Sequence, residues 1–144
     1  MNIISRALCL TVLFVPVVAL AADDAKGCDS VNWGPEVLAK FPNAQKGCRG
    51  VMMKDGNVYA HYMAKVVAAS AESVTVNMLD RDNKPFSEIT FVPAKTEINL
   101  NGKPTKVKDL KKGTDLDFWI QHNRWGLYSD PNSTPMTVLS RRDL

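Results

Sequence analysis

Side chains that commonly carry chemistry are scarce in this sequence of 144 residues. It contains two histidines and three cysteines, with no Cys-x-x-Cys pair, and nowhere do His, Cys, Asp and Glu follow the spacing of a metal site. It also lacks a Gly-x-Ser-x-Gly turn for a serine nucleophile and a glycine-rich loop for phosphate. We therefore expect no metal, no cofactor and no catalytic residue, and we classify the protein as a non-enzyme.

Long apolar runs are equally scarce, and the clearest one stands at the start of the sequence. Residues 7–18 follow Arg6, are interrupted by Pro16 and precede Ala19-Leu20-Ala21. A basic start, a short apolar run and a small-x-small site are typical of a secretory signal peptide, and the run is short for a membrane span. We expect residues 1–21 to be removed, which leaves a periplasmic or secreted protein without a membrane span.

A strong excess of one charge is missing too, since 18 Lys and Arg residues are balanced by 15 Asp and Glu residues. The net charge of +3 is too small to indicate a polyanion as partner. The densest basic stretch contains Lys103, Lys106, Lys108, Lys111 and Lys112. We expect its last two lysines to end a short helical turn capped by Gly113, where cations are favoured. Nucleic acid is therefore not an expected partner.

The three cysteines reduce to one pair once a signal peptide is removed. Cys9 lies within the expected signal, so Cys28 and Cys48 are the thiols that reach an oxidising compartment. We expect these two to form a structural disulfide, which would stabilise the fold by roughly 3 kcal/mol on a chain-entropy estimate.

The stretch between these cysteines predicts a short helix from Pro35 to about Phe41. Proline is favoured in the first turn of a helix, and Pro42 disfavours helical backbone at the residue before it. Val37, Leu38 and Phe41 share one face of this helix, and we expect them to pack on the rest of the protein.

From residue 51 onward the pattern changes to short strands, so residues 22–50 form a helical segment that precedes them. Asp55-Gly56 predicts a two-residue hairpin, and the next strand, from Val58 to about Ala69, is long enough to bend around a barrel. Further strands are expected at residues 73–79, 86–92, 97–100, 116–121 and 136–140, with a turn at Asn101-Gly102. Six or seven short strands predict that residues 51–144 are mainly β, a small antiparallel barrel of OB-like or SH3-like type.

The block over residues 96–118 has a recognisable order of strand, turn and strand. Residues 96–102 have the pattern T-x-I-x-x-x-G, residues 109–113 have D-L-x-x-G, and an apolar strand follows from Leu116. This block resembles the closing half of uncharacterised exported bacterial small β-barrel domains. The resemblance implies an OB-like or SH3-like fold and brings no catalytic residue with it.

Aromatic residues near the C-terminal end form a candidate binding surface. If the apolar residues of the strand at 116–121 face the core, alternation places Trp119 on the opposite face. Trp125 follows in an expected turn at residues 123–126, with Arg124 and Tyr128 close to it. Exposed aromatic residues beside an arginine are typical of surfaces that bind proteins or sugars.

The environment of Trp119 has a second interpretation, in which the N-terminal helix covers it. A helix of two turns is unstable alone, so it needs an apolar surface to pack on. Trp33 and Phe41 would then pack over Trp119 and bury it. We favour this covered arrangement over the exposed one.

These features predict an exported, non-catalytic binding or accessory protein of the bacterial cell envelope, whose partner is an envelope protein or a glycan. The alternative is a small secreted or periplasmic inhibitor of a hydrolase, which a rigid protruding segment at residues 80–85 or 123–132 would favour. A pocket that clusters His61 or His122 with acidic residues would instead indicate an enzyme.

Overall fold

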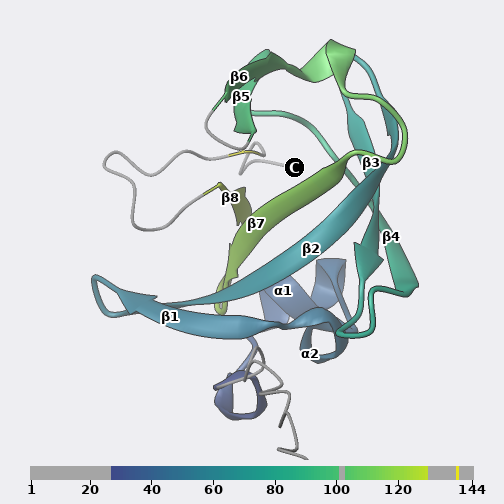
Figure 1. Cartoon of the computed structure of the whole chain (residues 1–144). Coiled ribbons are helices and arrows are strands. Elements are labelled where there is room, and N and C mark those ends of the chain that lie inside the picture. Colours follow the sequence, from purple (N-terminus) through teal and green to yellow (C-terminus); the bar gives the residue numbers. More distant parts are fainter. Residues whose placement is uncertain (1–26, 101–102, 130–138, 140–144) are drawn as a thin grey trace, which may run out of the picture.

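The computed structural model describes residues 27–100, 103–129 and 139. The expected signal peptide, the expected turn at 101–102 and most of the expected strand at 136–140 lie outside these residues. In chain order the elements are η1 (Cys28–Ser30), α1 (Pro35–Lys40), α2 (Ala44–Gly47), β1 (Gly50–Lys54), β2 (Asn57–Ala69), β3 (Val74–Leu79), β4 (Pro85–Phe91), β5 (Glu97–Leu100), β6 (Lys103–Lys106), η2 (Val107–Asp109), β7 (Asp115–Gln121) and β8 (Arg124–Tyr128) (Figure 1).

The long strand β2 is the centre of the sheet. It pairs with β1 and then with β3 along one edge and with β7 along the other, which gives the order β4-β3-β2-β7-β8. Every pair is antiparallel, and the register with β3 shifts between Val66 and Ala68, where a bulge bends the strand. The sheet curls into a half-barrel, while β5 and β6 form a separate two-stranded sheet (Figure 1). The expected mainly β fold with a small antiparallel barrel is therefore confirmed.

The turns show where local sequence signals determine the structure and where they mislead. Asp55 and Gly56 form the predicted hairpin between β1 and β2, with positive φ angles of 51° and 76°. The predicted turn at residues 123–126 is wrong, because His122 and Asn123 alone make the turn and β8 begins at Arg124. A strand therefore follows β7 directly, where the sequence predicts a longer connection.

The residues on the two faces of β2 and β7 differ in burial, and Tyr59 is the one residue of the more exposed face that is buried. We call the inner face the one that carries Ala60, Tyr62, Ala64, Leu116, Phe118 and Ile120, all of which are buried. We call the outer face the opposite one, which carries Tyr59, His61, Met63, Lys65, Asp115, Asp117, Trp119 and Gln121. The core lies against the inner face, because β3 contributes Val74, Val76 and Met78 to it by the predicted alternation.

Both short helices pack on the inner side of the sheet. Val37 and Phe41 are wholly buried, and the Phe41 ring meets the Tyr62 ring edge-on at 5.4 Å between centroids. The Tyr62 hydroxyl donates a hydrogen bond of 2.8 Å to the carbonyl of Ala44, the first residue of α2. Burial raises the pKa of this hydroxyl, so it stays protonated and able to donate.

One part of the helix prediction is wrong. Leu38 is 40% exposed, although the sequence places it on the buried face with Val37 and Phe41. The helix spans only Pro35–Lys40, and Val37 and Phe41, four residues apart, already fill its contact with the sheet. Leu38 lies about 100° further around the helix and faces outward.

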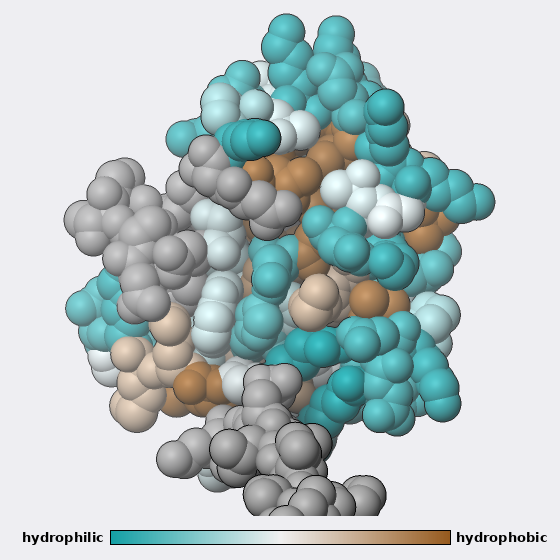
Figure 2. Space-filling view, viewed as in Figure 1, coloured by the Kyte–Doolittle hydropathy of each residue, from teal (hydrophilic) through white to brown (hydrophobic). Residues whose placement is uncertain are grey.

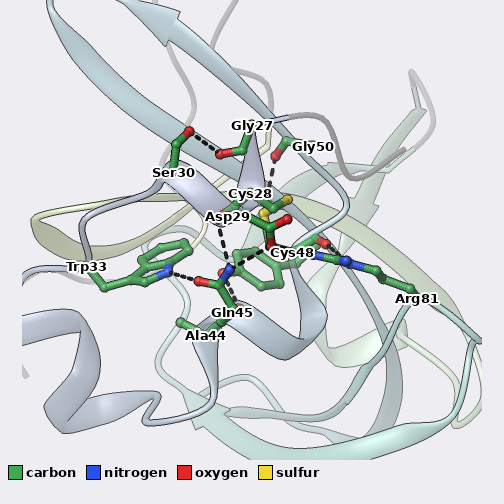
Figure 3. The surroundings of a disulfide bond; sticks show 11 residues. Gly27, Cys28, Asp29, Ser30, Trp33, Ala44, Gln45, Cys48, Gly50 and Arg81 are labelled. Atoms are coloured by element: carbon green, nitrogen blue, oxygen red, sulfur yellow. Dashed lines mark hydrogen bonds and ion pairs between the residues drawn. A yellow bond between two sulfur atoms is a disulfide. The ribbon is translucent and has the colours of Figure 1, made fainter. Parts of the chain in front are cut away.

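The predicted disulfide between Cys28 and Cys48 is confirmed. Both cysteines are wholly buried, and their Cα atoms are 5.9 Å apart. Gln45 in α2 accepts a hydrogen bond from the Trp33 indole and donates to the carbonyl of Cys28 (Figure 3). On the other side, the Arg81 side chain donates to the carbonyl of Cys48 at 3.0 Å. The disulfide thus links η1 to the residue after α2, and side chains from α2 and from the β3–β4 turn bind the carbonyls of the two cysteines.

The prediction that Lys111 and Lys112 end a helical turn is wrong. The helical turn η2 ends at Asp109, so Lys111 and Lys112 lie in the following turn and not in the last turn of a helix. Gly113 does adopt the predicted left-handed conformation, with φ of 87°. Its N–H donates to the carbonyl of Val66 at 2.7 Å, which leads the chain into the pairing of β7 with β2.

Leu139 connects β8 to the segment that follows β4. Its N–H donates to the carbonyl of Leu127 in β8 at 2.6 Å, and its carbonyl accepts from the N–H of Ala94, after β4, at 3.0 Å. The sequence predicts a closing strand at residues 136–140, and Leu139 is the part of it that the structure describes.

Candidate binding surface

The structure divides the four predicted surface residues into two pairs. Arg124 is exposed and Trp119 is half-buried, but Trp125 is 7% exposed and Tyr128 is wholly buried. The surface role predicted for Trp125 and Tyr128 is therefore wrong. The reason is β8: because this segment is a strand, Trp125 joins the core and Tyr128 packs edge-on against Tyr59, with 5.6 Å between ring centroids.

The expectation that the N-terminal helix covers Trp119 is also wrong. Trp33 and Phe41 both pack on Tyr62, with ring centroids 6.3 and 5.4 Å away. Tyr62 belongs to the inner face and Trp119 to the outer face. The N-terminal helix therefore packs on the inner face of the sheet, and it does not cover Trp119 on the outer face.

Trp119 lies at the centre of a row that crosses three strands. Its partner on β2 is His61, and its partner on β8 is Tyr128. The imidazole of His61 lies against the indole, with ring centroids 4.8 Å apart and planes inclined by 33°. Cross-strand pairs of this kind hold side chains in place on an antiparallel sheet. The indole is thus positioned by neighbours on both sides.

The charged residues of the outer face are arranged in pairs. Nε2 of His61 contacts the carboxylate of Asp117, and Nζ of Lys65 lies 2.5 Å from the carboxylate of Asp115. Each pair joins β2 to β7. Since both carboxylates remain more than half exposed, at 58% and 59%, these are surface pairs that contribute little to stability. Their main effect is to link side chains of β2 and β7 across the outer face.

Three amide side chains form a cluster beside the row. Gln121 follows Trp119 by two residues and so lies on the same face. Its Nε2 donates to Oδ1 of Asn57 and to Oδ1 of Asn123, both at 2.9 Å. We call Asn57, Gln121 and Asn123 the amide cluster. Arg124 is the cross-strand partner of Gln121, so the cluster borders an exposed guanidinium.

Sequence reasoning finds Trp119 and Arg124 but misses their neighbours. His61 and Asp117 are 56 residues apart in the chain, and Asn57 and Gln121 are 64 apart. Alternation assigns each to a face, but only the register between β2 and β7 brings them together. A prediction of that register would have found both.

The two histidines do not form a catalytic pocket. His61 and Asp117 lie on the open outer face of the sheet. His122 is structural, because its ring nitrogen lies 3.3 Å from the carbonyl of Val58 and its own carbonyl accepts from the N–H of Gly34 at 2.8 Å. Gly34 is required there, since a Cβ would come within 2.8 Å of the backbone of Asn123.

A cavity lined by described residues lies away from these histidines. It has a volume of about 710 Å³ and lies between the β2–β3 turn and the segment after β4. Among the described residues, its charged lining residues are Glu72 and Lys95, and most of the others are small. It lacks the convergent polar groups that orient a substrate in a catalytic site.

Within residues 27–100, 103–129 and 139, no three His, Cys, Asp or Glu side chains come close enough to hold a metal ion. No helix of this part has both the length and the apolar character needed to cross a bilayer.

The two segments that could present a rigid protruding loop, residues 80–85 and 123–132, differ in structure. Residues 124–128 form β8, and residues 130–132 lie outside the described part of the chain. The turn at Asp80–Lys84 is braced, because Arg49 donates to the carbonyl of Asp80 at 2.5 Å and to Oδ1 of Asn83 at 2.7 Å. The backbone N–H groups of Lys84 and Asp82 donate to the Asp80 carboxylate, which lowers its pKa.

Comparisons of the chain with protein-family models, with curated proteins and with solved structures find no match. The resemblance of residues 96–118 to exported small-barrel domains therefore stays a prediction. The geometry of the outer face has to carry any proposal about function.

Proposed function

We propose that this protein is an exported, non-catalytic binding protein of the bacterial cell envelope, and that the outer face of β2 and β7 holds its ligand. The observation that carries the proposal is the position of Trp119. It is half-buried on the face opposite the helices and fixed by its contact with His61. A large aromatic side chain that the core does not need is a common anchor for a ligand.

Two features support the proposed export of the protein to the periplasm or the medium. The first residues have the pattern of a secretory signal peptide. The pair Cys28–Cys48 forms a buried disulfide, which is compatible with an oxidising compartment. Expression of the full chain in a bacterium, followed by osmotic release and N-terminal sequencing, tests the address. We expect a periplasmic or secreted product that begins at residue 22, and a cytoplasmic product with residue 1 intact would contradict it.

Site-specific crosslinking tests the surface. The photoreactive residue benzoylphenylalanine, placed at Arg124, should form adducts with envelope components upon irradiation. The matched control places the same residue at Leu38, which is exposed on the helix side of the molecule. Adducts from position 124 and not from position 38 are expected, whereas equal labelling or none at position 124 would contradict the proposal.

One observation favours the alternative of a hydrolase inhibitor. The turn at Asp80–Lys84 is exposed from residue 81 and braced by Arg49, and inhibitors present rigid segments of this kind. Replacing Asp82 and Lys84 by alanine distinguishes the two proposals. This double variant would abolish inhibition of a hydrolase, but it should leave adducts from position 124 unchanged.

A further inference from the structure

We infer that the ligand of the outer face is an uncharged oligosaccharide, one sugar of which stacks on Trp119 while the amide cluster binds its hydroxyl groups. This inference rests on the proposed function, because it names the ligand class for the same surface. It is carried by three features: the position of the indole, the set of hydrogen-bonding groups beside it, and the pairing of the charges around it.

The indole of Trp119 provides a flat apolar surface of suitable size. One side of a pyranose ring exposes mainly C–H groups, and these pack well against an aromatic ring. His61 lies against Trp119 at 4.8 Å between centroids, so the indole is held before a ligand arrives. An anchor whose rotamer is already fixed loses little conformational entropy on binding.

The amide cluster provides the polar groups that sugar hydroxyls require. A hydroxyl both donates and accepts hydrogen bonds, and an amide side chain offers both functions without charge. The two bonds of 2.9 Å from Nε2 of Gln121 fix the cluster and leave its Oε1 as an acceptor, with no partner among the described residues. Gln121 lies about 6.6 Å along β7 from Trp119, close enough for one short sugar chain to contact both.

The charges of the outer face argue against an acidic ligand. Lys65 is paired with Asp115, and His61 with Asp117. A polyanion would have to compete with the carboxylate of Asp115 for Lys65, and the carboxylates of Asp115 and Asp117 would repel it. A neutral ligand leaves both pairs intact.

The apolar content of this face argues against a protein as the ligand. Protein interfaces have cores in which several large apolar or aromatic side chains cluster. The large apolar side chains that are exposed in the described residues are Leu38 and Met53, at 40% and 74%, and neither belongs to the outer face. In Figure 2 hydrophobic residues form one continuous area in the upper middle of the view, and elsewhere they reach the surface in smaller areas between hydrophilic residues. The other large apolar side chains on this face, Tyr59 and Met63, are buried or half-buried, so they add little exposed apolar area around Trp119.

Nuclear magnetic resonance of the indole N–H groups tests the inference directly. The three tryptophans give separate signals, and Trp33 and Trp125 serve as internal controls because they pack on the inner side. The oxidised mature protein is titrated with chitotetraose, maltotetraose and cellotetraose, and with tetragalacturonate as the acidic counterpart. We expect at least one neutral tetrasaccharide to shift the signal of Trp119 and to leave the two controls in place.

Variants then test which residues bind. Trp119→Ala and Gln121→Ala should each weaken binding of the responding tetrasaccharide about tenfold or more, as loss of an anchor does. Met53→Ala is the matched control, because it removes an exposed apolar side chain elsewhere and should leave the affinity unchanged. An equal loss in all three variants would overturn the inference.

The outcomes separate this inference from the proposed function. If tetragalacturonate binds as well as the neutral sugars, or if no neutral sugar shifts Trp119, the ligand is not a neutral oligosaccharide. In that case a protein adduct from position 124 would still support a binding role for the outer face. If position 124 also gives no adduct, both the inference and the proposed function are wrong.

Discussion

The two faces of β2 and β7 consist of alternate residues of the same strands, yet they differ in packing, polarity and exposure. The inner face holds Tyr62 and Phe118, which are buried beneath α1 and α2 or within the core. The outer face holds Trp119, His61 and Gln121, whose contacts are cross-strand pairs and side-chain hydrogen bonds. One aromatic residue therefore packs in the core, and the next in sequence lies half-buried on the opposite face.

The apolar inner face explains why two short helices can be stable on that side of the sheet. Neither helix exceeds six residues, a length at which an isolated helix does not form in water. The disulfide and the contacts of Tyr62 hold both helices against the sheet, and the helices cover part of the inner face. On the outer face Tyr59 and Tyr128 are buried and pack against each other, whereas the residues that β7 contributes to this face are half-buried or exposed.

The largest expected effect comes from Tyr62. Tyr62→Ala should lower the free energy of unfolding by about 3–5 kcal/mol, because it removes a wholly buried ring between the helices and the sheet. Tyr62→Phe keeps the ring and loses only the hydrogen bond to Ala44, so it should cost about 1–2 kcal/mol. Denaturant unfolding measures both variants. If Tyr62→Ala were no worse than Tyr62→Phe, the helices would not depend on this contact.

The disulfide is next in size. Replacing Cys28 and Cys48 by serine should lower the free energy of unfolding by about 3 kcal/mol, because the unfolded chain regains the entropy of an open loop. Unfolding of the unmodified protein in the presence of reductant should give the same loss. Alkylation of the oxidised mature protein without reductant should add no mass, and free thiols detected there would contradict the pairing.

Gly113 tests the turn that leads into β7. A Cβ at this position would meet no atom within 4 Å, so the φ of 87° alone opposes a side chain. Gly113→Ala should cost about 1 kcal/mol. Gly113→Asn should cost less, because asparagine tolerates positive φ. Equal melting temperatures for the alanine variant and the unmodified protein would contradict the conformation.

Asp80 gives a smaller effect that depends on pH. Its pKa is lowered in the folded protein, chiefly by the backbone N–H of Lys84. The ionised carboxylate therefore stabilises the fold above its unfolded pKa of about 3.9, and this contribution disappears as the pH falls through the lowered folded value.

The matching variant is Asp80→Asn, which removes the charge while an oxygen still accepts the backbone hydrogen bonds. We expect a slightly lower melting temperature than that of the unmodified protein at neutral pH. The difference should vanish as the pH falls through the lowered folded pKa of Asp80, where the carboxylate itself becomes protonated. A difference that stays constant over this range would show that the charge does not brace the turn.

Local signals in the sequence predict much of this fold. The Asp55-Gly56 hairpin, the alternation in β3 and β7, the helix at Pro35 and the disulfide all follow from residues close in the chain or from the small number of cysteines. These features depend on backbone preference and hydrophobic period, which a single sequence displays.

The features that sequence reasoning missed depend on distant pairing. Hydrophobic pattern shows which side of α1 is buried, but it does not show which face of the sheet receives it. That choice explains the wrong expectation for Trp119. Residues near Gly126 suggested a turn, so the sequence did not predict β8 or the burial of Trp125 and Tyr128 in it. His61 meets Asp117 only through the register of β2 with β7.

The most direct test of the account compares two adjacent aromatic residues, Phe118 and Trp119, by denaturant unfolding of their alanine variants. Phe118→Ala should lower the free energy of unfolding by about 3–5 kcal/mol, because it leaves a cavity in the core. Trp119→Ala should stay within about 1 kcal/mol of the unmodified protein, because the outer face does not hold the fold together. A loss for Trp119→Ala as large as that for Phe118→Ala would contradict the separation of the two faces and leave Trp119 with a structural role.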